Sequence, residues 1–382
     1  MAEKRKLFED VDAAPAQPVA AAGGLIARDT AAARFWTRLW LCLLFGLVVL
    51  MIAVGGLTRL TDSGLSITEW APVTGALPPM SDADWQSEFE KYRQIPEYQL
   101  QNKGMSLAEF KVIYWWEWGH RQLGRVIGLV WAVGFLVLLV ARKVPAGWTP
   151  RLLGLGALGG LQGAIGWWMV SSGLSGEMLD VASYRLAVHL GLAFIILGLI
   201  AWYINRLGRD AAHLLSARRA GDAKLFGMGT GLMHFAFLQI LIGALVAGID
   251  AGRSFTDWPL MGGGIIPERV FDMTPWWRNL FENAGFVQFT HRTVGYLFLI
   301  YAVVVWRVSR RSGNFGTRRA FDWVLVMTFG QIVIGIGTVL YAAPLEIAVF
   351  HQLGAVVLWV LVLRARFLAR YPKDQSVRGA AV

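Results

Sequence analysis

Residues 39–57 read LWLCLLFGLVVLMIAVGGL, nineteen residues without one charged side chain. A helix of this length rises about 28 Å, close to the ~30 Å hydrocarbon thickness of a bilayer. Because backbone polar groups in lipid must be satisfied within the segment, the predicted fold is an all-α integral membrane protein. Eight such transmembrane helices are predicted, at residues 36–57, 113–141, 151–173, 182–204, 226–248, 284–306, 321–343 and 346–367.

Composition supports this class and excludes others. Of the 382 residues 55% are hydrophobic and 16% are charged, which is not typical of a soluble domain. The net charge of +10 follows the connections between the spans: residues 142–151 and 307–319 contain no acid, whereas residues 58–112 and 249–283 are richer in acid than in base. We therefore predict cytoplasmic termini in a bacterial inner (cytoplasmic) membrane and no nucleic-acid partner.

One polar stretch occurs twice. DSGLSITEW, at residues 62–70, returns as DAGRSFTDW at residues 250–258, 188 positions later. Aligned without gaps, residues 54–79 and 242–267 share nine identities in twenty-six positions, where random pairing gives about two. The repeat predicts a duplication into two pseudo-symmetric four-helix bundles, with the repeated loop at the same place in each.

The duplication sets the predicted domain boundaries. Residues 35–206 form the N-terminal half and residues 226–370 the C-terminal half, joined by a cytoplasmic linker at residues 207–225. Residues 1–34, rich in Ala and Pro, are predicted to be a disordered cytoplasmic tail, and residues 371–382 a second cytoplasmic tail.

Four of the six histidines occupy similar places in alternate spans. Each lies about five to eight residues inside the predicted outer end of its span, or roughly 8–12 Å deep. HRQLG at residues 120–124 matches HRTVG at 291–295, and HLG at 189–191 resembles HQLG at 351–354. Ionisable groups in lipid are costly and commonly mark a functional site. The four are His120, His189, His291 and His351.

A histidine pair in each four-helix bundle is an arrangement that binds a heme iron from both faces. Zinc or copper normally recruits a carboxylate, a thiol or a third imidazole close by. The alternative is that the four side chains only hydrogen-bond between helices. Two pairs at one depth favour bis-histidine heme.

The two halves differ at one position. Glu117 lies three residues before His120, on the same helix face, and Gln288 takes that place before His291. We interpret this as a division of labour, in which the Gln half binds a heme statically and the Glu half moves protons or stabilises charge during chemistry. The alternative is a Glu that is solvated near the membrane surface.

Other polar and small residues accompany the histidines. Arginines at this level suit the planar carboxylates of heme propionates, with anchoring at the membrane interface as the competing interpretation. These candidate propionate contacts are Arg59, Arg121, Arg125, Arg185 and Arg292. A Gln followed four residues later by Gly recurs in the third, fifth and seventh spans, where the Gly either lines a heme or lets helices pack closely. The pairs are Gln162 and Gly166, Gln239 and Gly243, and Gln331 and Gly335.

With EWGH at residues 117–120, HR at 291–292 and histidines in the fourth and eighth spans, residues 35–370 resemble the heme A synthase family. The resemblance implies oxidation of the C8 methyl group of heme O to a formyl group through hydroxylated intermediates, which gives heme A for terminal oxidases. It implies a cofactor heme b on His291 and His351 in the C-terminal half. Substrate heme O would bind in the N-terminal half, where Glu117, His120 and His189 would be catalytic.

The same resemblance implies heme O synthase and cytochrome oxidase assembly factors as partners, besides membrane lipid and an unidentified electron donor. A homo-oligomer is compatible with the sequence. Many Gram-positive members carry a cysteine pair in the first outer loop, whereas Cys42, in the first span, is the single cysteine of this chain. A thiol-based step is therefore not expected, and the cysteine-free branch of alphaproteobacteria and mitochondria is the better match.

The repeated loops follow the first and fifth spans, at the predicted outer mouth of each bundle. We expect each loop to cover the exposed edge of a heme. Replacing Trp70 or Trp258 should therefore loosen heme retention in the corresponding half only.

Two rival classes have distinguishing features. A diheme b-type electron carrier would place its hemes in opposite leaflets so that electrons cross the membrane, whereas all four histidines here fall in the outer half. A transporter built from repeats would show interrupted helices with charges near the midplane. The midplane segments of this chain are continuous and apolar.

Overall fold

The computed structural model describes residues 30–176 and 178–375, which form helices and loops without a named β-strand. Eight helices in this part of the chain are long and apolar enough to cross a membrane, which confirms the all-α class and the number of spans. They are α1 (Ala31–Leu60), α4 (Leu107–Val140), α5 (Thr149–Val170), α6 (Ser183–Leu207), α8 (Ala223–Gly248), α10 (Ala284–Ser309), α11 (Phe315–Leu340) and α12 (Leu345–Arg370).

Polar caps extend some helices beyond their apolar stretches. α1 begins inside the predicted tail, because the Thr30 hydroxyl accepts a hydrogen bond from the Ala33 amide at 3.1 Å. α4 begins six residues before the predicted span with a capping box, in which Ser106 caps the amide of Glu109 and the carboxylate of Glu109 caps the amide of Ser106. The rest of the predicted tails, residues 1–29 and 376–382, lies outside the described residues.

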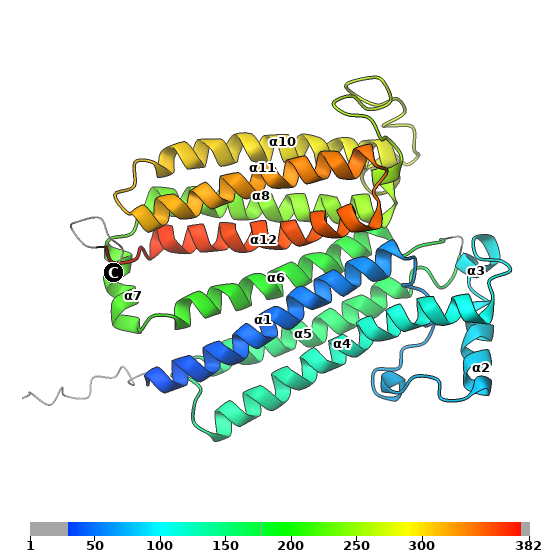
Figure 1. The fold of residues 1–382 in the computed structure, drawn as a ribbon, viewed down its shortest axis with the longest axis horizontal. Coiled ribbons are helices and arrows are strands. Elements are labelled where there is room, and N and C mark those ends of the chain that lie inside the picture. Colours follow the sequence, from blue (N-terminus) through cyan, green and yellow to red (C-terminus); the bar gives the residue numbers. More distant parts are fainter. Residues whose placement is uncertain (1–29, 177, 376–382) are drawn as a thin grey trace, which may run out of the picture.

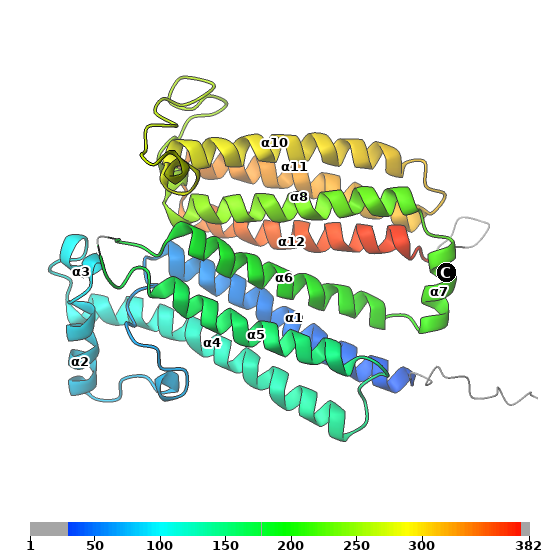
Figure 2. The ribbon, with the colours of Figure 1, turned by 180° about the vertical axis from the view of Figure 1, so that it is seen from behind.

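The long helices form two layers (Figures 1 and 2). One contains α1, α4, α5 and α6, and the other contains α8, α10, α11 and α12. In the first layer, α1 and α5 each pack against both α4 and α6. In the second, α8 and α11 each pack against both α10 and α12. Helices in equivalent positions along the two halves of the chain thus have equivalent neighbours.

The two layers share one apolar core. α6 packs against α8 and α12, and α1 also packs against α12. Polar side chains of α12 bridge the layers: Trp359 Nε1 donates to the Phe194 carbonyl at 3.0 Å, and Gln352 Nε2 donates to the Ile52 carbonyl at 2.7 Å. In the most apolar stretch of α6 50% of residues are buried, against 11% in α4 and α5, so α6 is central and those two helices are peripheral.

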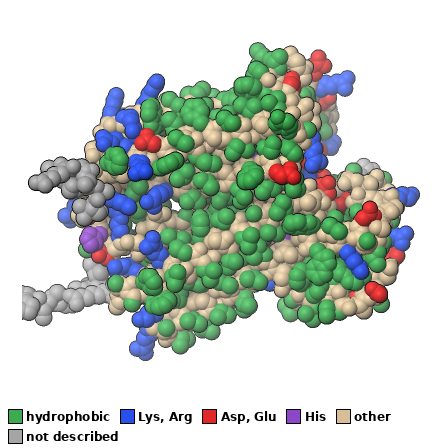
Figure 3. Space-filling model, viewed as in Figure 1, with side chains coloured by type: hydrophobic (Ala, Val, Ile, Leu, Met, Phe, Trp, Pro, Cys, Tyr) green, Lys and Arg blue, Asp and Glu red, His purple; other side chains and the backbone are tan. Residues whose placement is uncertain are grey.

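The two ends of the helix layers differ in character. We call the end that carries residues 61–106, 171–176, 178–182 and 249–283 the loop end, and the end that carries α7 (Ala211–Arg219) and Tyr371 the terminal end (Figure 1). At the loop end, α2 (Asp82–Tyr92) and α3 (Pro96–Leu100) pack against the start of α4 around the aromatic residues Trp85, Phe89, Tyr92, Phe110 and Tyr114. α7 lies within the predicted 207–225 linker. Figure 3 shows apolar side chains along the flanks of the long helices and Lys and Arg side chains at the terminal end.

Candidate heme sites

Each of the four histidine rings lies against a glycine of a neighbouring long helix. A Cβ atom added to that glycine would lie 2.8–3.1 Å from the ring Cε1 atom, which is closer than side chains normally approach. A larger residue would therefore have to displace the imidazole. The pairs, with this distance, are His120 on Gly55 (2.8 Å), His189 on Gly166 (2.9 Å), His291 on Gly243 (3.1 Å) and His351 on Gly335 (3.1 Å).

These contacts place the four rings at one level near the loop end. Each glycine lies four or five residues before its helix ends at that side of the molecule: Gly55 in α1, Gly166 in α5, Gly243 in α8 and Gly335 in α11. The common level agrees with the prediction. His120 is nevertheless thirteen residues from the start of α4, because the first turns of that helix extend past the span to pack on α2.

The rings of His291 and His351 lie close together in an edge-to-face arrangement. Their centroids are 6.4 Å apart and their planes differ by 79°. Two imidazoles that bind one metal ion from opposite sides, at about 2 Å per metal–nitrogen bond, have centroids roughly 6 Å apart. The Nδ1 atoms of His351 and His120 are both buried without a hydrogen-bond partner among the described residues. The spacing, the glycine contacts and the imidazole donors fit a bis-histidine heme in the second layer.

In two helices, the Gln and the Gly of the repeated pair contact the same imidazole. Gln162 Nε2 lies 3.2 Å from His189 Nδ1 and donates to the His189 carbonyl at 3.0 Å. Gln239 makes the same two contacts with His291, again at 3.2 and 3.0 Å. The glycine contacts therefore favour a role beside the histidines over helix packing alone. Gln331 differs, because its amide packs on Gly354.

Glu117 is 3% exposed and its carboxylate accepts hydrogen bonds from two segments. Oε2 accepts from the Ser66 hydroxyl at 2.7 Å and from the Ile67 amide at 2.8 Å, both in the first repeated loop. Oε1 accepts from Arg121, one turn along α4, at 2.6 and 3.0 Å. Glu117 is thus not solvated, and it fastens the loop to the helix that carries His120.

Gln288 has the equivalent position in the second half, but it donates a hydrogen bond to the repeated loop where Glu117 accepts. It is 2% exposed, and its Nε2 donates to the carbonyl of Phe255 at 3.0 Å. Phe255 lies 188 positions after Ile67, so the same loop position donates to a carboxylate in one half and accepts from an amide in the other. The Oε1 atom of Gln288 is buried without a partner among the described residues.

The arginines that follow His120 and His291 bind the repeated loops in the same way. Arg121 Nη2 donates to the Ile67 carbonyl at 2.7 Å and Nη1 to the Glu69 carbonyl at 2.9 Å. Arg292 donates to the equivalent carbonyls: Nη2 to that of Phe255 at 3.0 Å and Nη1 to that of Asp257 at 2.9 Å. The shared pattern is independent geometric support for the internal repeat.

Arg125 binds loop backbone as well, whereas Arg185 binds the backbone of the last turn of α5. Arg125 donates to the carbonyls of Ala71 and Pro72, both at 2.9 Å. Arg185 donates to the Trp168 carbonyl at 2.6 Å, with its guanidinium 4.6 Å from the centroid of that indole. Contact of any of these arginines with a propionate stays a prediction.

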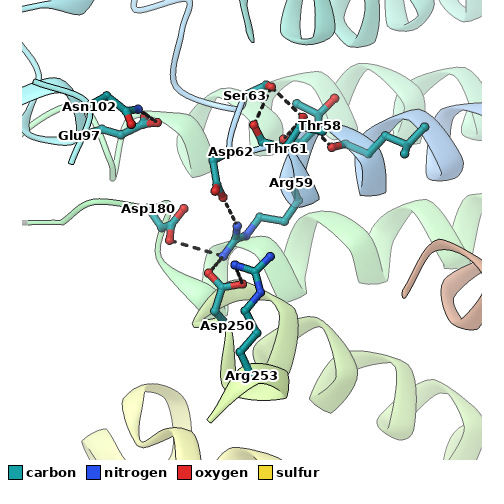
Figure 4. Close-up of polar contacts among 11 residues, drawn as sticks. Thr58, Arg59, Thr61, Asp62, Ser63, Glu97, Asn102, Asp180, Asp250 and Arg253 are labelled. Atoms are coloured by element: carbon teal, nitrogen blue, oxygen red, sulfur yellow. Dashed lines mark hydrogen bonds and ion pairs between the residues drawn. The ribbon is translucent and has the colours of Figure 1, made fainter. Parts of the chain in front are cut away.

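Arg59, at the end of α1, binds three carboxylates (Figure 4). Its Nη1 lies 2.9 Å from Asp62, and its Nη2 lies 2.9 Å from Asp250 and 3.4 Å from Asp180. Asp62 and Asp250 are the first residues of the two repeated stretches, and both have left-handed backbone, with φ of 47° and 51°. Burial raises the pKa of Asp180, and the charge of Arg59 opposes that shift.

Glu97, in α3, is a buried carboxyl that the sequence analysis missed. It is 3% exposed, accepts a hydrogen bond from Asn102 Nδ2 at 3.3 Å, and has a second oxygen without a partner among the described residues (Figure 4). Burial, followed by the charge of Asp180, raises its pKa to about 8. A Glu in a polar loop carries no pattern that reveals such burial.

The repeated tryptophans have different neighbours in the two halves. Trp70 lies beside Trp167 of α5, with ring centroids 5.4 Å apart. Trp258 Nε1 donates to the hydroxyl of Tyr296 in α10 at 2.8 Å. Both tryptophans are about half exposed and join a loop to a long helix, as a cover requires, and their effect on heme retention stays a prediction.

Comparison with known protein families and curated proteins gives consistent results. Residues 38–363 match the COX15-CtaA family, described as cytochrome oxidase assembly protein. Curated proteins named heme A synthase are similar along their whole length. That of Dinoroseobacter shibae is 65% identical over 383 residues and covers 100% of both chains. That of Roseobacter denitrificans is 64% identical, covering 99% of this chain and 100% of its own.

A third relative is similar at a slightly lower identity. The heme A synthase of Paracoccus denitrificans is 61% identical over 376 residues, covering 98% of this chain and 99% of its own. The family match covers all eight long helices in whole or in part and includes the four histidines, Glu117 and Gln288. The chain therefore belongs to the COX15-CtaA family of cytochrome oxidase assembly proteins.

Proposed function

We propose that this chain is a membrane-bound oxidoreductase that converts heme O to heme A by oxidising a methyl group to a formyl group. Full-length relatives at 61–65% identity carry the name heme A synthase. The observation that carries the proposal is the set of four imidazoles on four glycines, two in each helix layer and all at one level. This arrangement provides two places for a porphyrin, one for a substrate and one for a cofactor.

The cofactor site is proposed at His291 and His351, with heme b as the group held. When bound, heme b supplies an iron that exchanges single electrons. The protein's part is to hold the imidazoles: Gln239 orients His291, while Gly243 and Gly335 leave room for the rings. Gln288 keeps a neutral amide beside this site, so no carboxylate charge from that position acts on it.

The substrate site is proposed at His120 and His189, with Glu117 beside it. Conversion of methyl to formyl is a four-electron oxidation in two successive hydroxylations, whose oxidant and oxygen atoms come from outside the chain, after which the gem-diol loses one water. Loss of water from the diol moves one proton off a hydroxyl and one onto the leaving oxygen, which suits a carboxylate held in place. Glu117 Oε1 and Oε2 are fixed by Arg121, Ser66 and Ile67, so the acceptor is positioned before the substrate reacts.

The four rings at one level speak against the diheme carrier among the rival classes. A carrier that moves electrons across the membrane needs its hemes at different depths, whereas these histidines lie near the loop end in both layers. Continuous long helices with apolar interiors are likewise unlike the interrupted helices of a repeat transporter.

The proposal includes a topology and partners. Lys and Arg side chains gather at the terminal end (Figure 3), so we place that end in the cytoplasm of a bacterial inner membrane and the heme sites near the opposite surface. Residues 35–206 then form the substrate half and residues 226–370 the cofactor half. Heme O synthase, as the source of substrate, and cytochrome oxidase assembly factors, as recipients of product, are the proposed partners.

Pigment analysis tests this function directly. Membranes of a strain that lacks this gene should contain heme O and no heme A, and the wild-type gene should restore heme A. The purified protein should show a low-spin b-type spectrum, which His291→Ala should remove and His120→Ala should leave in place. Normal heme A in the deleted strain would overturn the activity, and a colourless wild-type protein would overturn the cofactor site.

A further inference from the structure

A basic cavity of about 250 Å³ lies at the terminal end, far from the four histidines of the candidate heme sites. Four arginines line it, together with apolar side chains that include Trp148 and Leu214, and no acidic residue is among its lining residues. The arginines are Arg34, Arg206, Arg209 and Arg218. All the charged side chains that line the cavity are therefore positive.

Two helices of the first layer and the connecting helix α7 form most of this cavity. Arg34 belongs to the first turn of α1, Arg206 to the last turn of α6, and Arg218 to α7, which connects the two halves of the chain. Tyr371, directly after α12, completes the lining. Because α1 and α6 span the membrane, a cavity at their ends lies at the depth of the lipid headgroups.

Two of the arginines have no side-chain partner in the part of the chain that the structure describes. The side chains of Arg206 and Arg218 make no hydrogen bond or ion pair with other described residues, and the Nε atom of Arg206 is buried without one. Arg209 donates to the carbonyls of Tyr371 and Pro372 at 3.0 and 2.8 Å, and burial lowers its pKa. Four guanidinium groups line one cavity without an acidic side chain among them, so an anion that accepts hydrogen bonds from them would be stabilising.

No nearby acidic side chain among the described residues forms an ion pair with Arg206 or Arg218. Asp210 precedes α7 and caps it by accepting from the His213 amide at 2.8 Å, and its other oxygen contacts the His213 ring. Its charge interacts with Arg34. The basic cavity therefore keeps unsatisfied positive charge on the side formed by α6 and α7.

We propose that the basic cavity binds the phosphate group of an anionic phospholipid, with Arg206 and Arg218 as its main ligands. Arginine suits phosphate because several N–H groups can bind its oxygens together. The apolar part of the lining, from Trp148 to Leu214, can accept the start of an acyl chain, which a free phosphate ion lacks. The lipid would join α1, α6 and α7 at the junction of the two halves.

Titration of the purified full-length protein in detergent tests this site. Phosphatidylglycerol, phosphatidylcholine and inorganic phosphate are added separately, and the unfolding temperature is followed. Phosphatidylglycerol should raise it in a saturable manner, phosphatidylcholine should not, and inorganic phosphate should act only at much higher concentration. If inorganic phosphate matched phosphatidylglycerol at equal concentration, the lipid assignment would be overturned.

Variants locate the effect. The half-shift concentration is the phosphatidylglycerol concentration that gives half of the maximal rise in unfolding temperature. The double variant Arg206→Gln with Arg218→Gln should increase it by at least about tenfold, since two charge-assisted contacts are lost. Without lipid, this variant should unfold at the wild-type temperature or above it, because charge repulsion is reduced. Arg219→Gln, the next position on α7 and outside the lining, should respond like wild type.

The single variant Arg218→Gln keeps the site testable if the double variant does not fold, because Arg218 is an exposed residue of α7. It should raise the half-shift concentration about threefold or more. A wild-type response from Arg218→Gln, or from a folded double variant, would show that the basic cavity is not the binding site.

Discussion

Nη2 of Arg59 lies 2.9 Å from the carboxylate of Asp250, across the boundary between the two helix layers. The same guanidinium binds Asp62 at 2.9 Å, and Asp62 is the counterpart of Asp250 in the first repeat. The second repeat has Ala247 at the position equivalent to Arg59. One cation from the first half therefore binds the same aspartate of both repeats and joins the two loops.

Arg59→Gln should separate these loops. Three carboxylates would lose their shared cation, and because they are 36–40% exposed the expected loss of stability is modest, about 1–3 kcal/mol. Thermal unfolding in detergent at low and high salt measures it, with Arg253→Gln as control, since the Arg253 guanidinium forms one ion pair among the described residues, to Asp250 at the longer distance of 3.6 Å. Equal unfolding temperatures for the two variants would contradict the joining role.

Gly243→Ala should lower the content of resident heme, because the added methyl would occupy the space of the His291 ring. Gly55→Ala should leave that heme in place and lower heme A production, because it crowds His120 instead. The b-type absorbance per protein and the extracted hemes measure these two effects.

The chain offers matched controls for these glycines. Gly227 in α8 and Gly46 in α1 have no neighbouring atom near an added Cβ, so their alanine variants should behave like wild type. Loss of heme from Gly227→Ala, or its retention at the wild-type level in Gly243→Ala, would refute the ring contact as the reason.

Glu117→Gln should lower heme A to below about a tenth of wild type and keep the resident heme. Gln has a single acceptor oxygen, so it cannot accept from Ser66 and Ile67 at one atom and from Arg121 at the other, and it carries no charge for Arg121. Heme extraction and the b-type spectrum provide the two readouts. Gln288→Glu, the reverse exchange, should instead disturb the cofactor half, where a carboxylate would face the Phe255 carbonyl. Normal heme A from Glu117→Gln would exclude a catalytic Glu117.

Glu97 should make stability depend on pH. Burial, followed by Asp180, raises its pKa from 4.5 to about 8, so the folded protein binds this proton more tightly than the unfolded chain. Stability should therefore fall as pH rises between about 4.5 and 8. Glu97→Gln should remove this part of the decline and raise the unfolding temperature at pH 8–9 relative to wild type. Parallel curves of unfolding temperature against pH for the two proteins would show that Glu97 is not the group responsible.

Much of the site could be read from the sequence, because each feature is local. Gln162 with Gly166, and Gln239 with Gly243, recur at one spacing, and both members of each pair meet a histidine. Gly55 has the same role and escaped notice, because Met51 stands where the pattern has Gln. Gly55 lies 188 residues before Gly243, the same spacing that separates the two repeated loops, and this spacing could have revealed its role.

The partners of charged side chains could not be read in this way. Arg121 and Arg292 suit a propionate by residue type, yet they donate to loop carbonyls at matching positions. Burial of Glu97 depends on the packing of α2 and α3 against α4, which no short pattern in the loop encodes.

The sequence by itself determined the eight spans, the internal repeat and the four histidines, because run length, spacing and residue type are properties of the chain read in order. Only the tertiary structure decided which glycine lies against which imidazole and that Arg59 binds Asp250, 191 positions away. Helix packing sets those contacts, and a contact between distant residues depends on the orientation of whole helices and not on any one stretch.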